Sequence, residues 1–560
     1  MKTKATYIIV LAALLSSCND EFLDCAPLDQ ITSENFWQSE DHLKAAANVF
    51  SDSFMGKDWL NRTEIMADSA PWSATTAWRT IGGGYYTSDI SQINSVWVGA
   101  YSNIGRVNYF LANYQRATSV KEAIRERYAA EAYFYRAYNY WLLTSYFGDV
   151  PYITDELDVN SPDVYRGRDA RAEVVANVTK DLEEHYKALP EYIEAASNEF
   201  GRITQMAALV LLQRLYLYNG MPDKALDAAD RAMALPYYEL YSTGKPKEDY
   251  LNLFNFTGRA SRNANNHETI LAQVFNDKLG ESARYAHNLS RELTEPTDYV
   301  RWVPTESMVE CYLTSDGKIW DPSTAATYAD VFKNRDPRMA QSIYAPGTPW
   351  KGGRAELNDA NGYAIFNLPK FVSDKNGAMS ASGYYMRKYA EMDILWFVGH
   401  DDNDIVMMRY AEVLLNYIEA KELVGGVTQN DIDKTINLIR DRVGMKRLTL
   451  TNIPAGSDLR TEIRRERRVE LFFEGLRYFD IIRWQQGELL GNDLLGVNRR
   501  WVEGVGLNID GLKWKKVGSE EYLVFESGRT FDPGKHYLLS LPFAQMQLNP
   551  NLKPNNPGWN

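Results

Sequence analysis

The sequence predicts a mostly α-helical fold, in which tetratricopeptide-like helical hairpins form a scaffold that carries long irregular loop insertions. Three observations support this prediction. Apolar residues recur three or four positions apart in many separate stretches, which is typical of amphipathic helices. Some of these stretches follow one another after a short turn and are rich in small residues. Between them lie segments rich in Gly, Asn, Pro and aromatic residues that show no helical period.

The helical period marks several stretches in order along the chain. They cover residues 36–50, 95–114, 121–147, 171–189, 203–219, 222–235, 408–423 and 430–442. The stretch at 121–147 runs into the sequence FGDVP, whose Gly and Pro are typical of a helix stop. We therefore expect a helix to end there and the chain to change direction.

The stretches at 203–219 and 222–235 predict a helix, a short turn and a second helix. Both contain small side chains that allow close packing: Ala207, Ala208, Ala225, Ala228, Ala229 and Ala232. This pattern resembles the tetratricopeptide repeat. The stretch at 121–147 can be paired with 171–189 in the same way, and 408–423 with 430–442. We therefore expect helical hairpins to recur, although they are too far apart for a plain solenoid.

The stretch at 464–484, RRERRVELFFEGLRYFDIIRW, is predicted as one scaffold helix. Its apolar face consists of residues three or four apart: Val469, Phe472, Leu476 and Phe479. Glu474 with Arg477, and Asp480 with Arg483, lie three residues apart on its flanks. A run of Arg and Glu could mark an anion site, but charges of alternating sign on a helix usually form salt bridges. We therefore expect a structural, ion-paired helix.

We expect a signal peptide at residues 1–17 and a single large domain at 18–560. The helical scaffold should cover about 36–255 and 404–485, with loop-rich ligand-binding insertions at about 56–94 and 258–400 and an irregular C-terminal region at 486–560. Residues 258–370 and 487–536 contain short β-like runs, and we expect the helical frame to display these segments. Trp and Tyr residues gather in them beside Gly, Ser and Asn, where a role in core packing is less natural.

Composition and motifs exclude several functions. With 61 Lys and Arg against 74 Asp and Glu, the net charge of −13 argues against nucleic acid as a partner. The three cysteines are too few for a disulfide framework, and the six histidines are scattered singly with no HExxH pattern. No GxSxG or Walker motif occurs. We expect no catalytic residue, no metal site and no cofactor.

The N-terminus reads as an export signal. Lys2 and Lys4 precede an apolar run at 7–15, which is far too short to span a bilayer as a helix. The sequence Leu-Ser-Ser-Cys that follows resembles the bacterial lipobox, which implies cleavage before Cys18 and lipid attachment to its thiol. The alternative is an ordinary signal peptide followed by a chance cysteine. Either way, we expect an exported chain.

Several motifs in order make the chain similar to the SusD-like (RagB/SusD) outer-membrane lipoproteins of Bacteroidetes. They include EAYFYRAYNYWLLTSYFGDVP at 131–151, GRIT at 201–204, RDPR at 335–338, RYAEVLL at 409–415 and the stretch at 464–484. Cys18, followed by DEFLD at 20–24, also fits, as does NPNL at 549–552. The resemblance extends along nearly the whole chain.

This resemblance implies properties that composition and periodicity do not. It implies a tetratricopeptide-like scaffold, a lipid anchor at the outer membrane, a position on the cell surface and no catalysis. It also implies a partner, a SusC-like TonB-dependent transporter, for which such proteins act as a hinged lid. The lid captures a glycan or oligosaccharide and passes it to the transporter barrel.

A carbohydrate site needs aromatic side chains against the apolar faces of the sugar rings and polar side chains at their edges. The segments at 64–86 and 285–320 supply both, and family members tend to place ligand-contacting loops there. The candidate ligand-binding residues are Asp68, Trp72, Trp78, Arg79, Tyr86, Tyr299, Trp302 and Trp320. The resemblance does not assign them one by one. Each Trp could instead fill a hydrophobic cluster, and Arg79 could belong to an ion pair.

Two other functions stay open. A glycoside hydrolase needs two carboxylates across the scissile bond, and no motif nominates such a pair. A tetratricopeptide-type protein could instead bind a peptide or protein on the concave face of its scaffold. Glycan binding with delivery to a transporter is the prediction that accounts for both the motifs and the aromatic loops.

Overall fold

The computed structural model describes residues 36–53, 57–280, 283, 299–350, 364–373, 378–390 and 401–559. The predicted signal peptide at 1–17 and Cys18 lie outside these residues, so their roles stay predictions. None of the helices in the described ranges combines the length and the hydropathy that a bilayer crossing requires.

The described residues are mostly helical and form three small sheets. The helices are α2 (Glu40–Asn48), α3 (Lys57–Met66), α4 (Ala77–Gly82), α5 (Ser91–Asn113), α6 (Glu122–Phe147), α7 (Arg171–His185), α8 (Gln205–Tyr218), α9 (Pro222–Met233), α10 (Asp249–Asn252), α12 (Glu306–Cys311), α13 (Pro337–Ser342), α14 (Tyr410–Val424), α15 (Gln429–Asp433), α16 (Ile436–Val443), α17 (Leu459–Glu470), α18 (Arg477–Arg483), α19 (Glu488–Gly491) and α20 (Phe543–Leu548). The strands are β1 (Thr269–Gln273), β2 (Thr348–Trp350), β3 (Ala364–Phe366), β4 (Ile405–Arg409), β5 (Leu494–Asn498), β6 (Trp514–Val517) and β7 (Glu520–Glu526).

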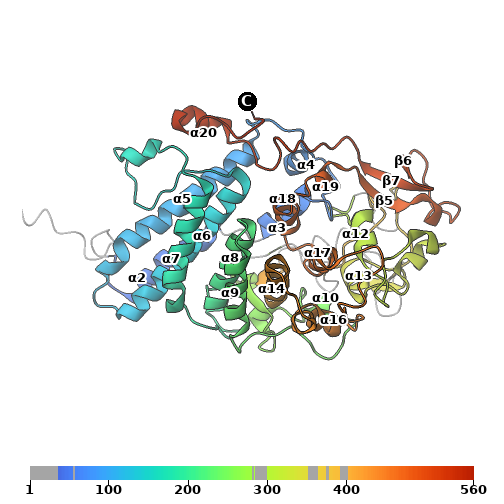
Figure 1. Ribbon diagram of the computed structural model, residues 1–560, viewed down its shortest axis with the longest axis horizontal. Helices are drawn as coiled ribbons and strands as arrows, with labels where there is room; N and C mark the ends of the chain where they lie inside the picture. Colours follow the sequence, from blue (N-terminus) through green and yellow to red (C-terminus); the bar gives the residue numbers. More distant parts are fainter. Residues whose placement is uncertain are drawn as a thin grey trace, which may run out of the picture.

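Helices α5 to α9 form an array in which each packs against the next, and α14 extends it by packing on α8 and α9 (Figure 1). Helix α8 lies inside this array, and its residues from Met206 to Tyr218 are all buried. On α9, the small residues Ala225, Ala228 and Ala232 are fully buried and allow the close approach of α8. The predicted hairpins of small-residue helices are therefore confirmed.

Local signals explain where these helices begin and end. The Thr204 side chain caps α8 by accepting a hydrogen bond from the Ala207 N–H at 3.2 Å. Pro222 occupies the first turn of α9, where its missing N–H costs nothing. Gly148, with φ +73°, ends α6 and turns the chain away from the array. The helix stop predicted at the end of 121–147 is confirmed.

The prediction of one helix at 464–484 is wrong, because α17 and α18 are separate. Between these two helices, Phe473 (φ +62°) and Gly475 (φ +77°) both have a left-handed backbone conformation. Phe473 is fully buried beside Trp302, at 5.8 Å between ring centroids, and this packing offsets the strain of its backbone. Of the two expected ion pairs, Asp480 with Arg483 forms at 2.8 Å.

The break redirects Glu474 into a buried cluster of charges. Glu474 does not pair with Arg477 but accepts hydrogen bonds from Arg409 (Nε, 2.7 Å) and Lys388 (Nζ, 2.7 Å). The Nη1 atom of Arg409 also donates to Glu268 and Glu470, each at 2.7 Å. These contacts fasten β4 to the end of α17 and to the turn after it, so the charged stretch is structural, as expected.

The insertion at 56–94 is less irregular than predicted, because it contains α3 and α4. Helix α4 begins where the Thr76 side chain accepts a hydrogen bond from the Arg79 N–H at 3.2 Å. This cap was not recognised among the surrounding Ser, Thr and Gly residues. The residues between α3 and α4 have no regular secondary structure, and they carry Trp72.

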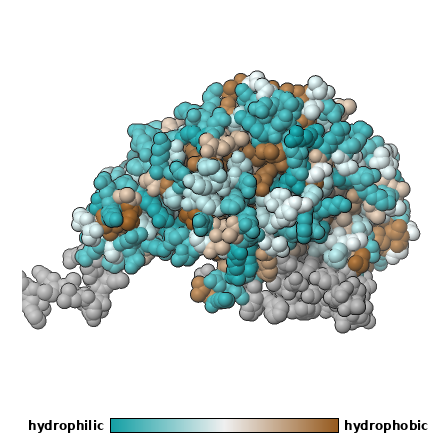
Figure 2. Space-filling model, turned by 90° about the horizontal axis from the view of Figure 1, so that it is seen from below, coloured by the Kyte–Doolittle hydropathy of each residue, from teal (hydrophilic) through white to brown (hydrophobic). Residues whose placement is uncertain are grey.

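The predicted irregular regions contain every described strand except β4, which lies at the start of the region predicted as scaffold, 404–485. Strands β1 and β4 pair antiparallel, as do β2 and β3, and β7 pairs antiparallel with both β5 and β6. The β5–β7–β6 sheet lies at the end of the molecule far from α5 and α7 (Figure 1). The face shown in Figure 2 is mostly hydrophilic, with small, separate apolar patches, which is usual for a protein surface.

Candidate functional site

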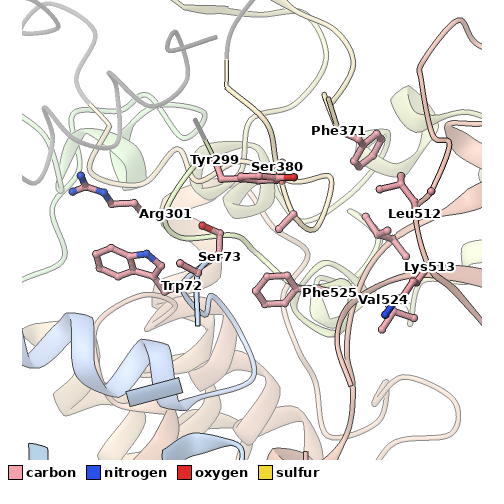
Figure 3. Close-up of a pocket in the computed structure, with 14 residues that line it drawn as sticks. Trp72, Ser73, Tyr299, Arg301, Phe371, Ser380, Leu512, Lys513, Val524 and Phe525 are labelled. Atoms are coloured by element: carbon pink, nitrogen blue, oxygen red, sulfur yellow. The ribbon is translucent and has the colours of Figure 1, made fainter. Parts of the chain in front are cut away.

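The larger candidate site is an open cavity of about 680 Å³ between the loop after α3, the segment at 299–301 and the edge of the β5–β7–β6 sheet (Figure 3). It is lined by Trp72, Ser73, Ala74, Tyr299, Arg301, Phe371, Ser380, Ala381, Gly511, Leu512, Lys513, Leu523, Val524 and Phe525. The lining combines aromatic rings, hydroxyl groups and cationic side chains. Its volume lies within the range typical of small-molecule sites.

Backbone pairing holds one wall of this cavity in place. The Ser73 N–H donates to the Arg301 carbonyl at 2.6 Å, and the Val303 N–H donates to the Pro71 carbonyl at 3.1 Å. The indole rings of Trp72 and Trp302 meet at 5.0 Å between centroids. Trp302 is buried behind the wall, whereas Trp72 is half-buried and lines the cavity. Trp302 therefore supports the ring that faces the ligand space.

Tyr299 lines the same cavity with a side chain that is 45% exposed. The next residue, Val300, donates its N–H to the Met379 carbonyl at 2.9 Å, and this brings Ser380 to the cavity as well. In Figure 3 the Trp72 ring lies on the same side of the cavity as Arg301. The guanidinium of Arg301 is 5.6 Å from the centroid of the Trp72 ring.

Arg79 does not line the cavity but joins two of its walls from behind. It is buried and forms an ion pair with Glu526 at the end of β7. Its Nη1 donates to the carbonyls of Trp72 (3.2 Å) and Ser73 (2.8 Å), and its guanidinium lies 4.3 Å from the centroid of the Phe525 ring. The ion pair left open as an alternative for Arg79 is present, and it positions residues on both walls.

The wall formed by residues 511–513 and 523–525 was missed by sequence reasoning. The Val524 N–H donates to the Lys513 carbonyl at 2.8 Å, which continues the pairing of β6 with β7. A signal was present in the apolar run YLVF at 522–525, which lies between Gly518 and Gly528 and reads as a strand. The sequence could not show that this strand faces Trp72.

Besides Trp302, three further aromatic candidates do not line the cavity. Trp78 is half-buried, with the guanidinium of Arg62 at 5.4 Å from its ring. Tyr86 is buried against Trp559 at 4.5 Å, and Trp320 is buried against Trp501 at 5.9 Å. They pack in the hydrophobic core or against it. We leave these three out of the proposed site.

Asp68 lies in a different place, a second cavity of about 360 Å³. It forms ion pairs with Arg477 (2.8 Å) and Arg468 (3.2 Å). Burial by itself would raise the pKa of Asp68, but these two arginines outweigh it and hold the pKa well below its usual range. Asp68 is therefore ionised and paired with arginines of the protein, and it does not line the larger cavity.

The second cavity is also lined by Glu306 and Glu310, one turn apart on α12. Burial raises the pKa of Glu306 well above its usual value, and the nearby charge of Glu310 raises it further. Burial also raises the pKa of Glu310, which accepts a hydrogen bond from the Tyr522 hydroxyl at 3.3 Å. Glu306 is buried, and one of its carboxyl oxygens accepts a hydrogen bond from the Tyr384 hydroxyl. Its side chain therefore belongs to the protein core.

Over the described part of the chain, no group of three or more His, Cys, Asp or Glu side chains could hold a metal ion. The larger cavity offers aromatic faces, the hydroxyls of Ser73 and Ser380, and two cationic side chains. Such a set of groups can bind a ligand that has apolar faces edged by hydrogen-bonding groups.

Two family models match the chain. The model described as the SusD family matches residues 267–559, and the model described as "Starch-binding associating with outer membrane" matches residues 21–217. Among curated relatives, SusD-like protein P2 of Formosa agariphila is 25% identical over 587 residues, with 100% of each chain covered. A SusD-like protein of Bacteroides ovatus is 23% identical, and the match covers 97% of this chain and 93% of the relative.

Solved structures share the fold. A SusD-like carbohydrate-binding protein of Bacteroides fragilis matches with a TM-score of 0.77 at 24% identity, covering 92% of this chain and 100% of that one. Surface glycan-binding protein A of Bacteroides thetaiotaomicron, in complex with laminarihexaose, matches with a TM-score of 0.63 at 18% identity, covering 92% of this chain and 99% of that one. The predicted mostly α-helical fold is confirmed.

Proposed function

The chain belongs to the SusD family, and from this premise we propose that it binds a glycan or oligosaccharide in the cavity lined by Trp72 and Tyr299. It captures the ligand at the outer membrane and passes it to a SusC-like TonB-dependent transporter. It is a binding protein and catalyses no reaction. Trp72 and Tyr299 contact the ligand directly, while Trp302 and Arg79 hold the contacting residues in position.

The observation that carries this proposal is the composition of the cavity. Trp72 and Tyr299 offer aromatic surface in one open space of about 680 Å³ that also has hydroxyl and cationic groups. The C–H faces of a sugar ring pack on aromatic rings, while its hydroxyls need polar partners at the ring edge. Because Trp72 is backed by buried Trp302, its ring is held in place before the ligand arrives.

The printed descriptions of relatives support a glycan as the ligand. One matching model is described as starch-binding and as associating with the outer membrane. A structure with the same fold is named a SusD-like carbohydrate-binding protein, and another was solved with laminarihexaose. These descriptions belong to those proteins, and they favour the same ligand class for this cavity.

The membrane anchor and the transporter are parts of the same proposal. The sequence Leu-Ser-Ser-Cys at 15–18 supports lipid attachment at Cys18 after removal of residues 1–17. Incorporation of an alkyne-tagged fatty acid into the wild-type chain, and its loss in Cys18→Ala, would support the anchor. Incorporation that is unchanged in Cys18→Ala would contradict it. Co-purification with a TonB-dependent transporter from solubilised outer membranes tests the partner.

The proposal that the protein is not an enzyme depends on where its carboxyl groups lie relative to the larger cavity. A glycoside hydrolase needs two carboxyl groups about 5 to 10 Å apart across the scissile bond. Among the described residues, those that line the larger cavity include no Asp and no Glu. Glu306 and Glu310 line the second cavity instead, and Glu306 is buried among protein partners.

The proposal is tested by affinity electrophoresis of the purified chain through gels that contain different polysaccharides, with a parallel binding screen on peptides. We expect at least one polysaccharide to retard the protein, and we expect no new reducing ends when that polysaccharide is incubated with it. Binding of peptides without any polysaccharide would overturn the proposal in favour of a peptide-binding protein. New reducing ends would show an enzyme.

A further inference from the structure

The second cavity, of about 360 Å³, contains carboxyl groups that the protein does not neutralise. Four acidic residues belong to its lining: Asp68, Glu306, Glu310 and Asp493. Asp68 pairs with Arg468 at 3.2 Å, and Asp493 pairs with Lys515 at 2.6 Å. In the described ranges no Arg, Lys or His side chain forms an ion pair with Glu306 or Glu310. The charge of these two carboxyl groups is therefore left without a counter-charge.

Glu306 and Glu310 lie on the same face of helix α12. They are four residues apart, which is about one helical turn. Helix α12 packs against strand β5 and helix α17 (Figure 1). Both side chains line the space between this helix and the β5–β7–β6 sheet.

Glu306 has one carboxyl oxygen without a partner. The residue is 3% exposed, and its Oε2 accepts a hydrogen bond from the Tyr384 hydroxyl at 2.5 Å. Its Oε1 is buried and receives no hydrogen bond from the part of the chain that the structure describes. A buried acceptor without a partner costs free energy. A donor that enters the cavity would relieve this cost.

Glu310 is the more accessible of the two, because its side chain is half-buried. Its Oε1 accepts a hydrogen bond from the Tyr522 hydroxyl at 3.3 Å. Its Oε2 accepts none from a described residue. Glu310 can therefore meet a ligand directly, with Glu306 deeper in the wall.

The two cations whose charges reach these carboxyl groups, Arg335 and Arg468, are occupied elsewhere. The Nη2 atom of Arg335 donates to the backbone carbonyls of Val309 (2.6 Å) and Tyr312 (2.8 Å). Arg468 pairs with Asp68. Neither arginine forms an ion pair with Glu306 or Glu310, so both carboxyl groups can receive a cation from outside the chain.

We propose that the second cavity binds the primary ammonium group of a small polar ligand, with Glu310 in contact with the ammonium and Glu306 behind it as a second acceptor. An ammonium group brings one positive charge and three donors, so it can serve both carboxyl groups. The exposed amide of Asn492 also lines the cavity and can bind a hydroxyl or carbonyl group of the same ligand.

The size and the donor set of the cavity favour this ligand class. A volume of about 360 Å³ is near the lower end of small-molecule sites, so it suits one or two sugar rings or one amino acid. A metal ion fits less well, because among the described residues no three His, Cys, Asp or Glu side chains are grouped to hold one. An amino sugar and a lysine side chain both carry the required ammonium group.

The test uses matched ligands with and without the ammonium group. Ligand-observed NMR titration of the purified full chain compares glucosamine with glucose and N-acetylglucosamine, and Nα-acetyl-lysine methylamide with its norleucine analogue. We expect at least one amine to bind roughly tenfold more tightly than its neutral counterparts, since one charge-assisted contact contributes about that much. The two sets distinguish an amino sugar from an amino acid as the source of the ammonium group.

Variants assign this preference to the second cavity. Glu310→Gln keeps the shape of the side chain and its contact with Tyr522 but removes the charge, so most of the preference should be lost. Glu306→Gln should weaken amine binding as well. Glu488→Gln is the control, because Glu488 is exposed on the nearby helix α19 and does not line the cavity. Unchanged thermal unfolding of Glu310→Gln and Glu488→Gln shows that their fold is intact.

The pH dependence of binding gives a second readout. Burial, with the added charge of Glu310, raises the pKa of Glu306, and burial also raises the pKa of Glu310. A proton therefore competes with the ammonium group at higher pH than it would at an exposed carboxyl group. A lysine-type amine stays charged from about pH 5 to about pH 8. Its affinity should rise several-fold over this range.

The other groups that face the two carboxyls should not produce this pH dependence. Asp68 and Asp493 have pKa values below their usual range, and burial raises the pKa values of Tyr384 and Tyr522. None of these four changes charge between about pH 5 and about pH 8. The facing cations keep the positive charge that such side chains ordinarily carry there: Arg335, Arg468 and Lys515.

Three results would overturn the inference. They are equal binding of amines and their neutral counterparts, a preference for amines that survives Glu310→Gln, and an affinity for the lysine-type amine that does not rise with pH. The inference goes beyond the proposed function, because it concerns a different cavity. Its failure would leave glycan binding at Trp72 standing, and loss of glycan binding at Trp72 would leave the ammonium site standing.

Discussion

The guanidinium of Arg79, on helix α4, forms a buried ion pair with the carboxylate of Glu526, at the end of strand β7. The same guanidinium donates to the backbone carbonyls of Trp72 and Ser73 and lies against Phe525. Residues far apart in the sequence thus meet behind one ligand space. The shape of the cavity depends on a side chain that does not line it.

We predict that Arg79→Met lowers the free energy of unfolding by about 3 to 5 kcal/mol, because it leaves the buried Glu526 carboxylate without its main partner. The variant should also weaken glycan binding, since Trp72 loses its anchor. Urea denaturation measures the first effect, and titration with a glycan that the wild-type chain binds measures the second.

The matched control is Arg460→Met, which removes an exposed ion pair with Glu422 and should change stability by less than about 1 kcal/mol. The double variant Arg79→Met/Glu526→Leu should not recover the lost stability, because buried Arg529, which also pairs with Glu526 at 3.4 Å, then loses its carboxylate partner. Equal stability losses for Arg79→Met and Arg460→Met would contradict this role of Arg79.

Arg409 should be among the most sensitive residues of the scaffold. It is 1% exposed, and its guanidinium contacts Glu268, Glu470 and Glu474. We predict that Arg409→Met costs about 3 to 5 kcal/mol of unfolding free energy or prevents folding, because it leaves buried carboxylates with fewer cationic partners. Differential scanning calorimetry and yield of soluble protein measure this.

The comparison for Arg409 is Arg447→Met, which removes an exposed pair with Asp441. That change should shift the melting temperature very little. A variant Arg409→Met that folds and melts like the wild-type chain would mean that the buried charges are stabilised by other contacts.

Protonation of Glu419 should lower the free energy of unfolding in acid. Burial alone would raise the pKa of this carboxyl group, but the charge of Arg483 and its hydrogen bonds lower the pKa from 4.5 to about 2. Because the pKa is lower in the folded chain, the ionised group stabilises the fold above its unfolded pKa. This contribution, about 3 kcal/mol at most, is lost as the pH falls from 4.5 towards about 2.

Urea denaturation at a series of pH values tests this prediction by comparing the wild-type chain with Glu419→Gln. We expect the variant to be less stable at neutral pH and the difference to shrink below the unfolded pKa of Glu419. Parallel pH profiles for the two proteins would show that Glu419 does not carry this pH dependence.

Much of the scaffold could be predicted from the sequence, because long helices have a clear period. The array from 91 to 233 follows apolar spacing, small residues at 225–232 and a glycine at the end of α6. The break between α17 and α18 could not be predicted in the same way. Its glycine is a weak signal, and the left-handed backbone at Phe473 exists because tertiary packing on Trp302 supports it.

The candidate site could be predicted only in part. Trp72 and Tyr299 were found because aromatic residues in glycine-rich and polar segments are unusual, and they line one cavity. Trp320 and Tyr86 have similar sequence surroundings but are buried in the core. Phe525 and Lys513 were missed because only tertiary structure brings a C-terminal strand next to a loop more than four hundred residues earlier.

Calorimetric titration of Trp72→Ala with a glycan that the wild-type chain binds tests the central claim most directly. We predict that the variant loses about 1 to 2 kcal/mol of binding free energy, a factor of roughly 5 to 30 in affinity, because a stacking surface is removed. Tyr165→Ala, which removes an exposed tyrosine that does not line this cavity, should bind like the wild-type chain. Equal affinities of the wild-type chain and Trp72→Ala would contradict glycan binding in this cavity.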